Sequence, residues 1–126
     1  MVTRIVLPKL PSATGWGFAE VARRSGDFAL AAVAATLTLR DGTIAEARVA
    51  MTGVDETAKR ATEAEALLVG STLTPELIDA AVAAVRADVS PPTDLHASAE
   101  YRRHLIGVLV GRALADAWRR AQGDES

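Results

Sequence analysis

The sequence predicts an α+β fold, a two-layer sandwich in which a small antiparallel β-sheet of about three to four strands is followed by, and packed under, three α-helices. Asp41-Gly42 separates two alternating runs, and Asp-Gly in that position is a strong hairpin signal. After Gly53 the spacing of apolar residues changes from a period of two to one of about 3.6. Strands first and helices afterwards is the order typical of an α+β sandwich.

The N-terminal part of the chain predicts two strands of unequal strength. Residues 3–7 are rich in β-branched side chains and end at Pro8, so we expect an edge strand there. Residues 8–15, with Pro, Ser and Gly, are typical of a loop. Residues 18–23 alternate weakly and predict a second strand, and residues 24–27 predict a turn after it.

The predicted hairpin has arms at residues 31–39 and 44–52, joined by Arg40-Asp41-Gly42-Thr43. One face of the first arm is apolar, and it carries Val33, Ala35, Leu37 and Leu39. One side of the second arm carries Ala45, Ala47, Val49 and Met51, and the other carries Ile44, Glu46, Arg48 and Ala50. We therefore expect one buried face and one mixed face for the sheet.

Three helices are predicted beyond the hairpin. The first spans residues 57–69, with Gly70 at its C-terminal cap. Thr74-Pro75-Glu76 is a helix start, with threonine as N-cap, proline at the first position and an acid in the first turn, and this helix runs to about residue 87. The longest helix spans residues 98–120. The apolar stripes predict the core positions Leu67, Leu77, Val82, Leu105 and Leu109.

Composition bounds the class of protein. The 126 residues predict one domain, 1–126, with a modest core. A formal net charge of −2 argues against a nucleic-acid partner, and the longest apolar run, residues 28–35, is too short for membrane insertion. There is no cysteine, which excludes a disulfide, a thiolate metal site and a cysteine nucleophile. We expect a cytoplasmic protein.

The residues offer little sign of catalysis or of metal binding. Gly15-Trp16-Gly17 resembles part of a phosphate-binding loop but lacks the third glycine and the following helix. His96 and His104 are more than two helical turns apart, which does not suit a helical zinc pair. We expect no catalytic residue and no metal site.

The charged residues favour structural roles. Asp27 after two arginines fits a turn-capping aspartate better than a catalytic acid, and Glu63 and Glu65 fit solvated charges. An anion clamp made by Arg102, Arg103 and Arg112 is the weaker alternative to ion pairing. Their expected partners are Asp94, Glu100 and Asp116, on the surface or at a subunit contact.

Four ordered segments resemble one protein family. Residues 18–35 resemble the F-x-x-x-A-R-R-x-G-D-F-A-x-x-x-V-A segment of the flavin-carrying medium subunits of molybdenum hydroxylases, the aerobic carbon monoxide dehydrogenase and xanthine dehydrogenase family. Residues 96–105 resemble the S-A-E-Y-R-R-x-L opening of their last helix, and residues 47–54 and 60–70 fall between in the family's order. The similarity spans nearly the whole chain and is to the subunit's C-terminal domain.

The resemblance implies a role beside FAD. In such subunits FAD lies mainly against two preceding domains with glycine-rich loops, and the third domain approaches the flavin ring. By position, Val2, Glu20 and Phe28 match candidate flavin contacts. Glu20 stands where carbon monoxide dehydrogenase-like relatives can place a lysine, and Ala19 stands where xanthine dehydrogenase-like relatives do. We expect FAD in the intact subunit and weak or absent FAD binding by this chain alone.

Two functions remain open from the sequence. The first is a domain that closes the FAD site and docks the subunit for electron transfer from iron–sulfur clusters to FAD. Its implied partners are N-terminal FAD-binding domains, an iron–sulfur subunit with [2Fe-2S] clusters and a subunit with the molybdenum cofactor. The alternative is a free-standing, non-catalytic assembly or dimerisation module that has lost flavin binding, so a homo-oligomer is also considered.

Overall fold

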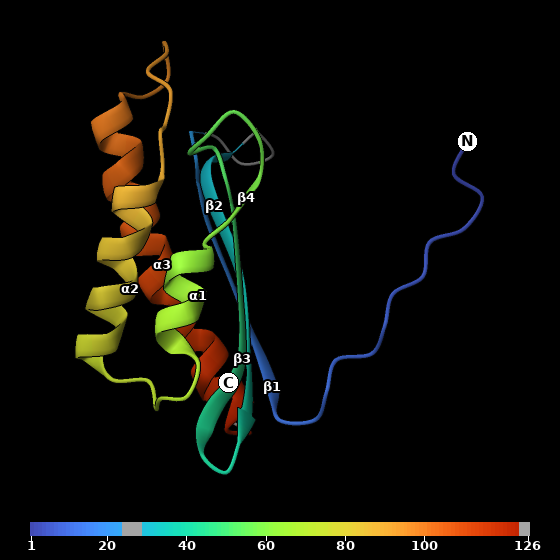
Figure 1. Cartoon of the computed structure of the whole chain (residues 1–126). Coiled ribbons are helices and arrows are strands. Elements are labelled where there is room, and N and C mark those ends of the chain that lie inside the picture. Colours follow the sequence, from blue (N-terminus) through green and yellow to red (C-terminus); the bar gives the residue numbers. More distant parts are fainter. Residues whose placement is uncertain (24–28, 124–126) are drawn as a thin grey trace.

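A computed structural model describes residues 1–23 and 29–123. It confirms the α+β sandwich: a four-stranded antiparallel sheet in the order β1-β2-β3-β4, with three helices following it in the chain. All three helices cover one face of the sheet, and the N-terminal segment lies on the opposite side (Figure 1). The elements are β1 Thr14–Ala22, β2 Ala29–Arg40, β3 Thr43–Thr52, β4 Lys59–Arg60, α1 Thr62–Leu68, α2 Pro75–Asp88 and α3 Ala99–Ala121.

The predicted hairpin is present as β2 and β3. Asp41 (φ 54°) and Gly42 (φ 78°) both have positive φ, the conformation that a tight two-residue hairpin turn needs and that aspartate and glycine tolerate. The register shifts between Thr38 and Leu39, so that Thr38 faces Glu46 while Leu39 faces Ile44. This bulge turns Ile44 onto the buried face. The expected alternation, which put Ile44 beside Glu46, is therefore wrong at this residue.

The predicted strand at 18–23 exists but begins earlier than expected. β1 starts at Thr14 and pairs antiparallel with β2 through to Ala22, so Gly15 and Gly17 lie inside a strand. Residues 3–7 form no strand: they are extended, exposed and not hydrogen-bonded to any other described residue. The prolines at 8 and 11 prevent this segment from continuing directly into a hairpin with β1. The turn expected at 24–27 lies outside the described residues.

The first helix is shorter than predicted. Lys59 and Arg60 pair with β3 as β4, and the Ala61 N–H donates to the Val49 carbonyl at 2.9 Å, so the chain becomes helical only at Thr62. Ala64 and Leu68 point inward from the shortened helix, and Glu65 takes the inward place that Leu67 was expected to hold. Leu67 is 45% exposed, so its assignment to the core is wrong.

The other two helices begin as their capping residues predict. Thr74 Oγ1 accepts from the Leu77 N–H at 3.1 Å, with Pro75 in the first turn, and Ser98 Oγ accepts from the Tyr101 N–H at 3.1 Å. Of the remaining predicted core residues, Leu105 and Leu109 are buried, and Leu77 and Val82 are half-buried against the core. The largest side chains of the core are Leu37, Ile44, Met51, Leu68, Ile106, Leu109 and Leu114.

Candidate functional site

The face of the sheet opposite the helices is open. Along β1 the side chains alternate, so Ala19 and Val21 pack toward the helices while Trp16, Phe18 and Glu20 point to the open face. Trp16 and Phe18 are 52% and 53% exposed, which is unusual for aromatic residues in the middle of a strand. The open face therefore carries an exposed aromatic row that ends in a carboxylate.

Small side chains form the middle of this face. Phe18 lies opposite Ala34, which in turn lies opposite Ala50 on β3. Beyond them are the guanidinium groups of Arg48 and Arg60. Arg48 is paired with Glu46 at 2.5 Å and Arg60 with Glu65 at 2.7 Å, so the cationic side is already largely neutralised.

Arg120 reaches from the end of α3 around the edge of β1. Its Nη1 donates to the Trp16 carbonyl at 2.8 Å, and its guanidinium carbon lies 3.9 Å from the centroid of the Trp16 ring. The stacked cation restrains the indole and occupies one acceptor at the open strand edge. Trp16 is therefore held in place on the face rather than free to rotate.

Gly15 and Gly17 have a packing role. A Cβ on Gly15 would collide with the Ala117 carbonyl oxygen and the Ala121 nitrogen, and one on Gly17 would collide with the Ala113 backbone. α3 thus packs directly against the backbone of β1. A signal for this contact was available in the sequence, because the glycines share one face of a strand while the alanines at 113, 117 and 121 share one stripe of a helix.

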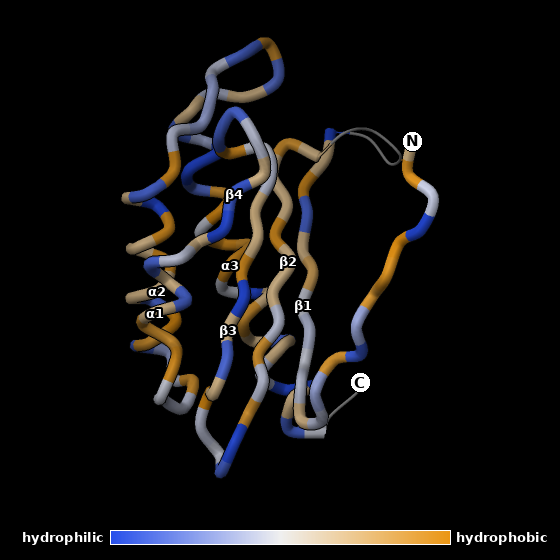
Figure 2. The backbone as a smooth tube through the Cα atoms, turned by 45° about the vertical axis from the view of Figure 1, so that its right-hand side comes forward, coloured by the Kyte–Doolittle hydropathy of each residue, from blue (hydrophilic) through white to orange (hydrophobic). Residues whose placement is uncertain are grey.

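The structure describes two of the three residues that the resemblance implied for flavin, and it does not bring these two together. Glu20 is exposed on the open face, and Ala19, the alternative lysine position, packs on the helix side. Val2 is 77% exposed on the N-terminal segment, which runs apart from the sheet in Figures 1 and 2. Phe28 lies outside the described residues. The structure therefore places Glu20 on the open face and does not bring Val2 to it.

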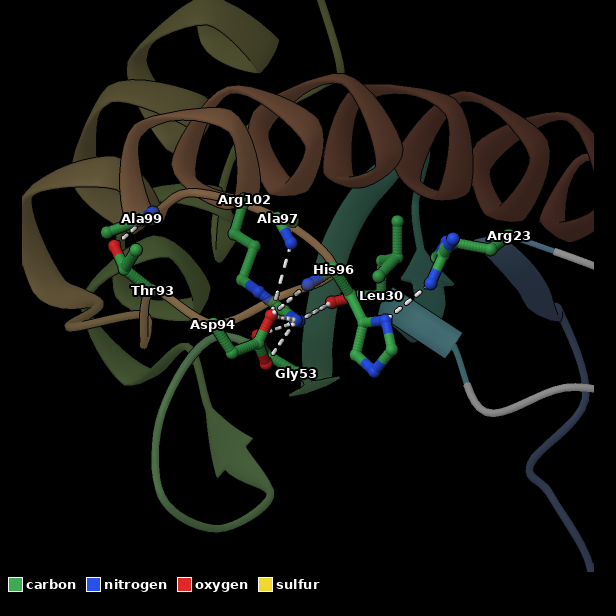
Figure 3. Close-up of polar contacts among 9 residues, drawn as sticks. All are labelled: Arg23, Leu30, Gly53, Thr93, Asp94, His96, Ala97, Ala99 and Arg102. Atoms are coloured by element: carbon green, nitrogen blue, oxygen red, sulfur yellow. Dashed lines mark hydrogen bonds and ion pairs between the residues drawn. The ribbon is translucent and has the colours of Figure 1, made fainter.

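A polar cluster lies at the start of α3 and joins four parts of the chain (Figure 3). Arg102, only 5% exposed, donates through Nη1 to the carbonyls of Leu30 and Gly53, at 2.6 and 3.2 Å. Its Nη2 forms an ion pair with Asp94, at 3.0 Å to one carboxylate oxygen and 3.2 Å to the other. The expected pairing with Asp94 is thus present, but Arg102 is buried rather than at the surface. It ties β2 and the residue that follows β3 to the loop before α3.

Asp94 also fixes this loop. Its Oδ1 accepts from the N–H groups of His96 and Ala97, at 2.9 and 3.1 Å. These two backbone hydrogen bonds and then the Arg102 guanidinium hold the pKa of Asp94 below its usual value. His96, expected in a cap region, accepts at Nδ1 from Arg23 Nη1 at 2.6 Å and so links the loop to the end of β1. The cluster offers structural hydrogen bonds and no nucleophile–base pair.

Glu65 covers part of the outer edge of β3, on the side of the sheet away from β1. Its carboxylate accepts from the Val49 N–H at 2.8 Å and from Arg60 at 2.8 and 2.7 Å, and it is 9% exposed. Burial raises the pKa of Glu65, but the hydrogen bonds from Arg60 and Val49 outweigh that effect, so the pKa is lowered overall. The prediction that Glu65 is a solvated charge is therefore wrong, whereas Glu63 is exposed as expected.

The described residues form neither a metal-binding cluster nor a membrane-spanning helix. Within residues 1–23 and 29–123, no group of three or more His, Asp or Glu side chains is placed to hold a metal ion. No helix in that part of the chain has the length and apolar character needed to cross a membrane.

Comparisons with known proteins all point to one family. The model of the CO dehydrogenase flavoprotein C-terminal domain matches residues 16–117. The chain is 40% identical over 117 residues to the nicotine 6-hydroxylase medium subunit of Paenarthrobacter nicotinovorans, covering 93% of this chain and 41% of that subunit. It is 36% identical over 122 residues to the carbon monoxide dehydrogenase medium chain of Afipia carboxidovorans, covering 97% and 42%.

The solved structures show the same relationship. The carbon monoxide dehydrogenase of Hydrogenophaga pseudoflava, in a form that lacks the Mo-pyranopterin moiety of the molybdenum cofactor, superposes with a TM-score of 0.87 at 38% identity. The match covers 90% of this chain and 40% of that one. The chain thus spans about two fifths of the length of the relatives it matches.

Proposed function

The chain belongs to the family of CO dehydrogenase flavoprotein C-terminal domains, and from this membership we propose that it closes one side of the FAD site of a molybdenum hydroxylase medium subunit. In this role it docks the subunit so that electrons pass from [2Fe-2S] clusters to FAD. The clusters and the molybdenum cofactor belong to partner subunits, and most of the FAD site belongs to the N-terminal FAD-binding domains.

The position of Glu20 supports the proposal. Of the two positions at which relatives can carry a lysine near the flavin, only Glu20 points to the open face, while Ala19 is turned toward the helices. Trp16 and Phe18 stand on the same face and give a flat aromatic ring an apolar approach. A flavin edge brought to this end of β1 meets a carboxylate.

The residues fit one edge of a flavin ring and not the whole nucleotide. Tight FAD sites enclose the pyrophosphate with backbone N–H groups from glycine-rich turns, often at a helix N-terminus. The Gly15–Gly17 pair cannot do this, because both glycines lie within β1 and face the backbone of α3. This chain would therefore need the FAD-binding domains to hold the cofactor.

Glu20 also sets the electrostatics of that edge. FAD supplies the redox chemistry when it is bound, and charge near the ring tunes its potential. A carboxylate disfavours negative charge on a nearby reduced ring, whereas a lysine favours it. Glu20 therefore makes the flavin harder to reduce than a lysine in its place would.

Titration of FAD into the pure chain tests whether the chain needs the FAD-binding domains to hold the cofactor. We expect a Kd no tighter than about 100 μM, by flavin fluorescence and by calorimetry, because residues 1–23 and 29–123 offer no glycine-rich turn that could enclose the pyrophosphate. The matched measurement uses the medium subunit of nicotine 6-hydroxylase with its C-terminal domain replaced by this chain. We expect that chimera to retain FAD, with a lower flavin potential than in its Glu20→Gln or Glu20→Lys variants. Micromolar binding by the isolated chain, or FAD loss from the chimera, would contradict the proposal.

The alternative is a free-standing assembly module that has lost flavin. The observation that favours it is Glu20 itself, which replaces a cation with an anion on the face in question. Under this alternative, the chimera carries no FAD and the pure chain self-associates. Flavin content and molar mass by light scattering thus distinguish the two functions.

A further inference from the structure

We propose that Arg102 is a positioning residue for Glu20: it holds a bulge in β2 beside the end of β1, and this bulge sets the direction in which Glu20 meets the flavin edge. The inference rests on the proposed function and deepens it, because it names the residue that places the carboxylate. Arg102 belongs to α3, which covers the other face of the sheet, so it acts on Glu20 through the backbone of β2.

The bulge lies within two residues of Glu20. The register of β1 against β2 shifts between Val21 and Ala22, which leaves Leu30 as an extra residue in β2. Leu30 and Ala31 are both buried, at 8% and 0% exposed, although successive residues of a regular strand point to opposite faces. A bulge bends its strand, increases its twist and so redirects the side chains next to it. The direction of Glu20 therefore depends on this bulge.

Arg102 supplies the hydrogen bond that the bulge leaves open. Its Nη1 donates to the carbonyl of Leu30, the extra residue, at 2.6 Å and to the carbonyl of Gly53, the first residue after β3, at 3.2 Å. Gly53 approaches so closely that a Cβ on it would lie 2.3 Å from the Leu30 oxygen. A buried carbonyl without a donor is costly, so the bulge requires the guanidinium.

The loop before α3 holds the guanidinium and also the end of β1 (Figure 3). Asp94 pairs with Arg102 Nη2 at 3.0 Å, and its Oδ1 accepts from the His96 N–H at 2.9 Å. His96 Nδ1 accepts from Nη1 of Arg23, the residue after β1, at 2.6 Å. One network thus reaches Arg23 and Leu30, which lie on the two strands that the bulge joins.

Stability alone does not account for the guanidinium. Arg102 is 5% exposed, and its Nε has no hydrogen-bond partner among the described residues. Burial of a charge costs its hydration, which an apolar side chain of similar volume does not lose. An apolar side chain has no donor for the Leu30 carbonyl, however, and so could not hold the bulge. Arg102 therefore contributes a geometry at the end of β1 that an apolar residue would not.

A double-mutant comparison of flavin potentials tests the coupling. The medium-subunit chimera described above is prepared with Glu20 and with Glu20→Gln, each in the wild-type and the Arg102→Met background. Removal of the carboxylate should raise the flavin potential of the wild-type chimera. We expect Arg102→Met to reduce this shift to less than half, and Arg102→Lys to restore part of it, because an ammonium group still donates to a carbonyl.

Arg103→Met is the matched control. Arg103 follows Arg102 on α3 and also donates to two backbone carbonyls, but these belong to Arg86 and Val89, at 3.2 and 3.3 Å, away from the bulge. The potential shift on Glu20→Gln should therefore keep its full size in the Arg103→Met background.

Hydrogen exchange in the isolated chain gives a second readout that needs no flavin. Val21 and Ala31 pair beside the bulge, and Gly17 and Ala35 pair further along the same strands. A global loss of stability speeds exchange by the same factor at both pairs, whereas loss of the bulge acts locally. We expect Arg102→Met to speed exchange at the first pair at least tenfold more than at the second.

Asp94→Asn is the second variant, and it serves in both measurements if Arg102→Met does not fold. Asparagine keeps an oxygen for the His96 N–H but removes the ion pair with Arg102. We expect the same pattern as for Arg102→Met, in a milder form.

The outcomes separate the inference from the proposed function. Equal Glu20→Gln shifts in the wild-type and Arg102→Met backgrounds, or uniform acceleration of exchange along β1 and β2, overturn the inference and leave the proposed function standing. A wild-type chimera that retains FAD, but whose potential does not respond to Glu20→Gln, overturns the role of Glu20 and the inference with it. Loss of FAD from the wild-type chimera overturns the proposed function and the inference together.

Discussion

Gly17→Ala tests the close packing of α3 on β1. The new Cβ would lie 2.7 Å from the carbonyl carbon of Ala113 and 2.9 Å from its Cα, and closer still to its oxygen. Ordinary carbon–carbon contacts are about 3.5–4.0 Å, so the helix has to retreat by about 1 Å along a contact made of backbone, which has no rotamer to change. Overpacking of this kind costs about 1–3 kcal/mol, against which alanine regains only about 0.5–1 kcal/mol of strand stability over glycine.

The net expectation for Gly17→Ala is a loss of about 1–2 kcal/mol, or about 4–8 °C in Tm for a domain of this size. Gly111→Ala is the matched control, because its Cβ would meet only Ile78 Cγ2, at an ordinary 3.6 Å. That change, inside α3, should stabilise the protein by about 0.5–1 kcal/mol. Urea and thermal unfolding followed by circular dichroism measure both. A Gly17→Ala protein as stable as the wild type would refute the packing argument.

Two further predictions concern the buried charges. Arg102→Met leaves the carbonyls of Leu30 and Gly53 without their donor, so it should lower the free energy of unfolding in urea by about 2–4 kcal/mol. Arg102→Lys should recover part of this loss. Equal unfolding midpoints for the wild type and Arg102→Met would contradict the role of the cluster. Glu65 has a folded-state pKa below its ordinary 4.5, so its stabilising contribution is complete above pH 4.5 and is lost as the pH falls through the lower, folded value. Glu65→Gln should therefore lose less stability than the wild type between pH 5 and 3, and identical slopes would count against the argument.

Local signals predicted the features that depend on local contacts. The Asp41-Gly42 turn and the caps at Thr74 and Ser98 are determined by residues within a few positions of one another, and all three are present. The bulge that turns Ile44 inward and the replacement of Leu67 by Glu65 depend on contacts between distant segments. An alternating or helical pattern carries no information about such contacts.

The candidate site likewise combines features that the sequence predicted with features that depend on contacts between distant segments. The resemblance offered both Glu20 and Ala19 as positions near the flavin, and only the pleat of β1 shows that Glu20 points to the open face while Ala19 packs toward the helices. The burial of Arg102 could not be predicted from the sequence, because its carbonyl partners at Leu30 and Gly53 are 72 and 49 residues away. An arginine within a charged run is ordinarily at the surface, and only the assembled fold supplies the acceptors that allow its burial.

The two edges of the sheet differ in a way that limits aggregation. On the β3 side, the Glu65 carboxylate occupies the Val49 N–H, Gly70 and Ser71 bond the backbone of Ile44, and β4 covers Ala50 and Met51. On the β1 side, Arg120 holds the Trp16 carbonyl. Endless growth of a fibre by strand addition needs two receptive edges on every copy, each fitting the next. Among the described residues the β1 edge is the more open of the two, so pairing of two sheets edge to edge would join β1 to β1 and leave no second receptive edge from which a filament could grow.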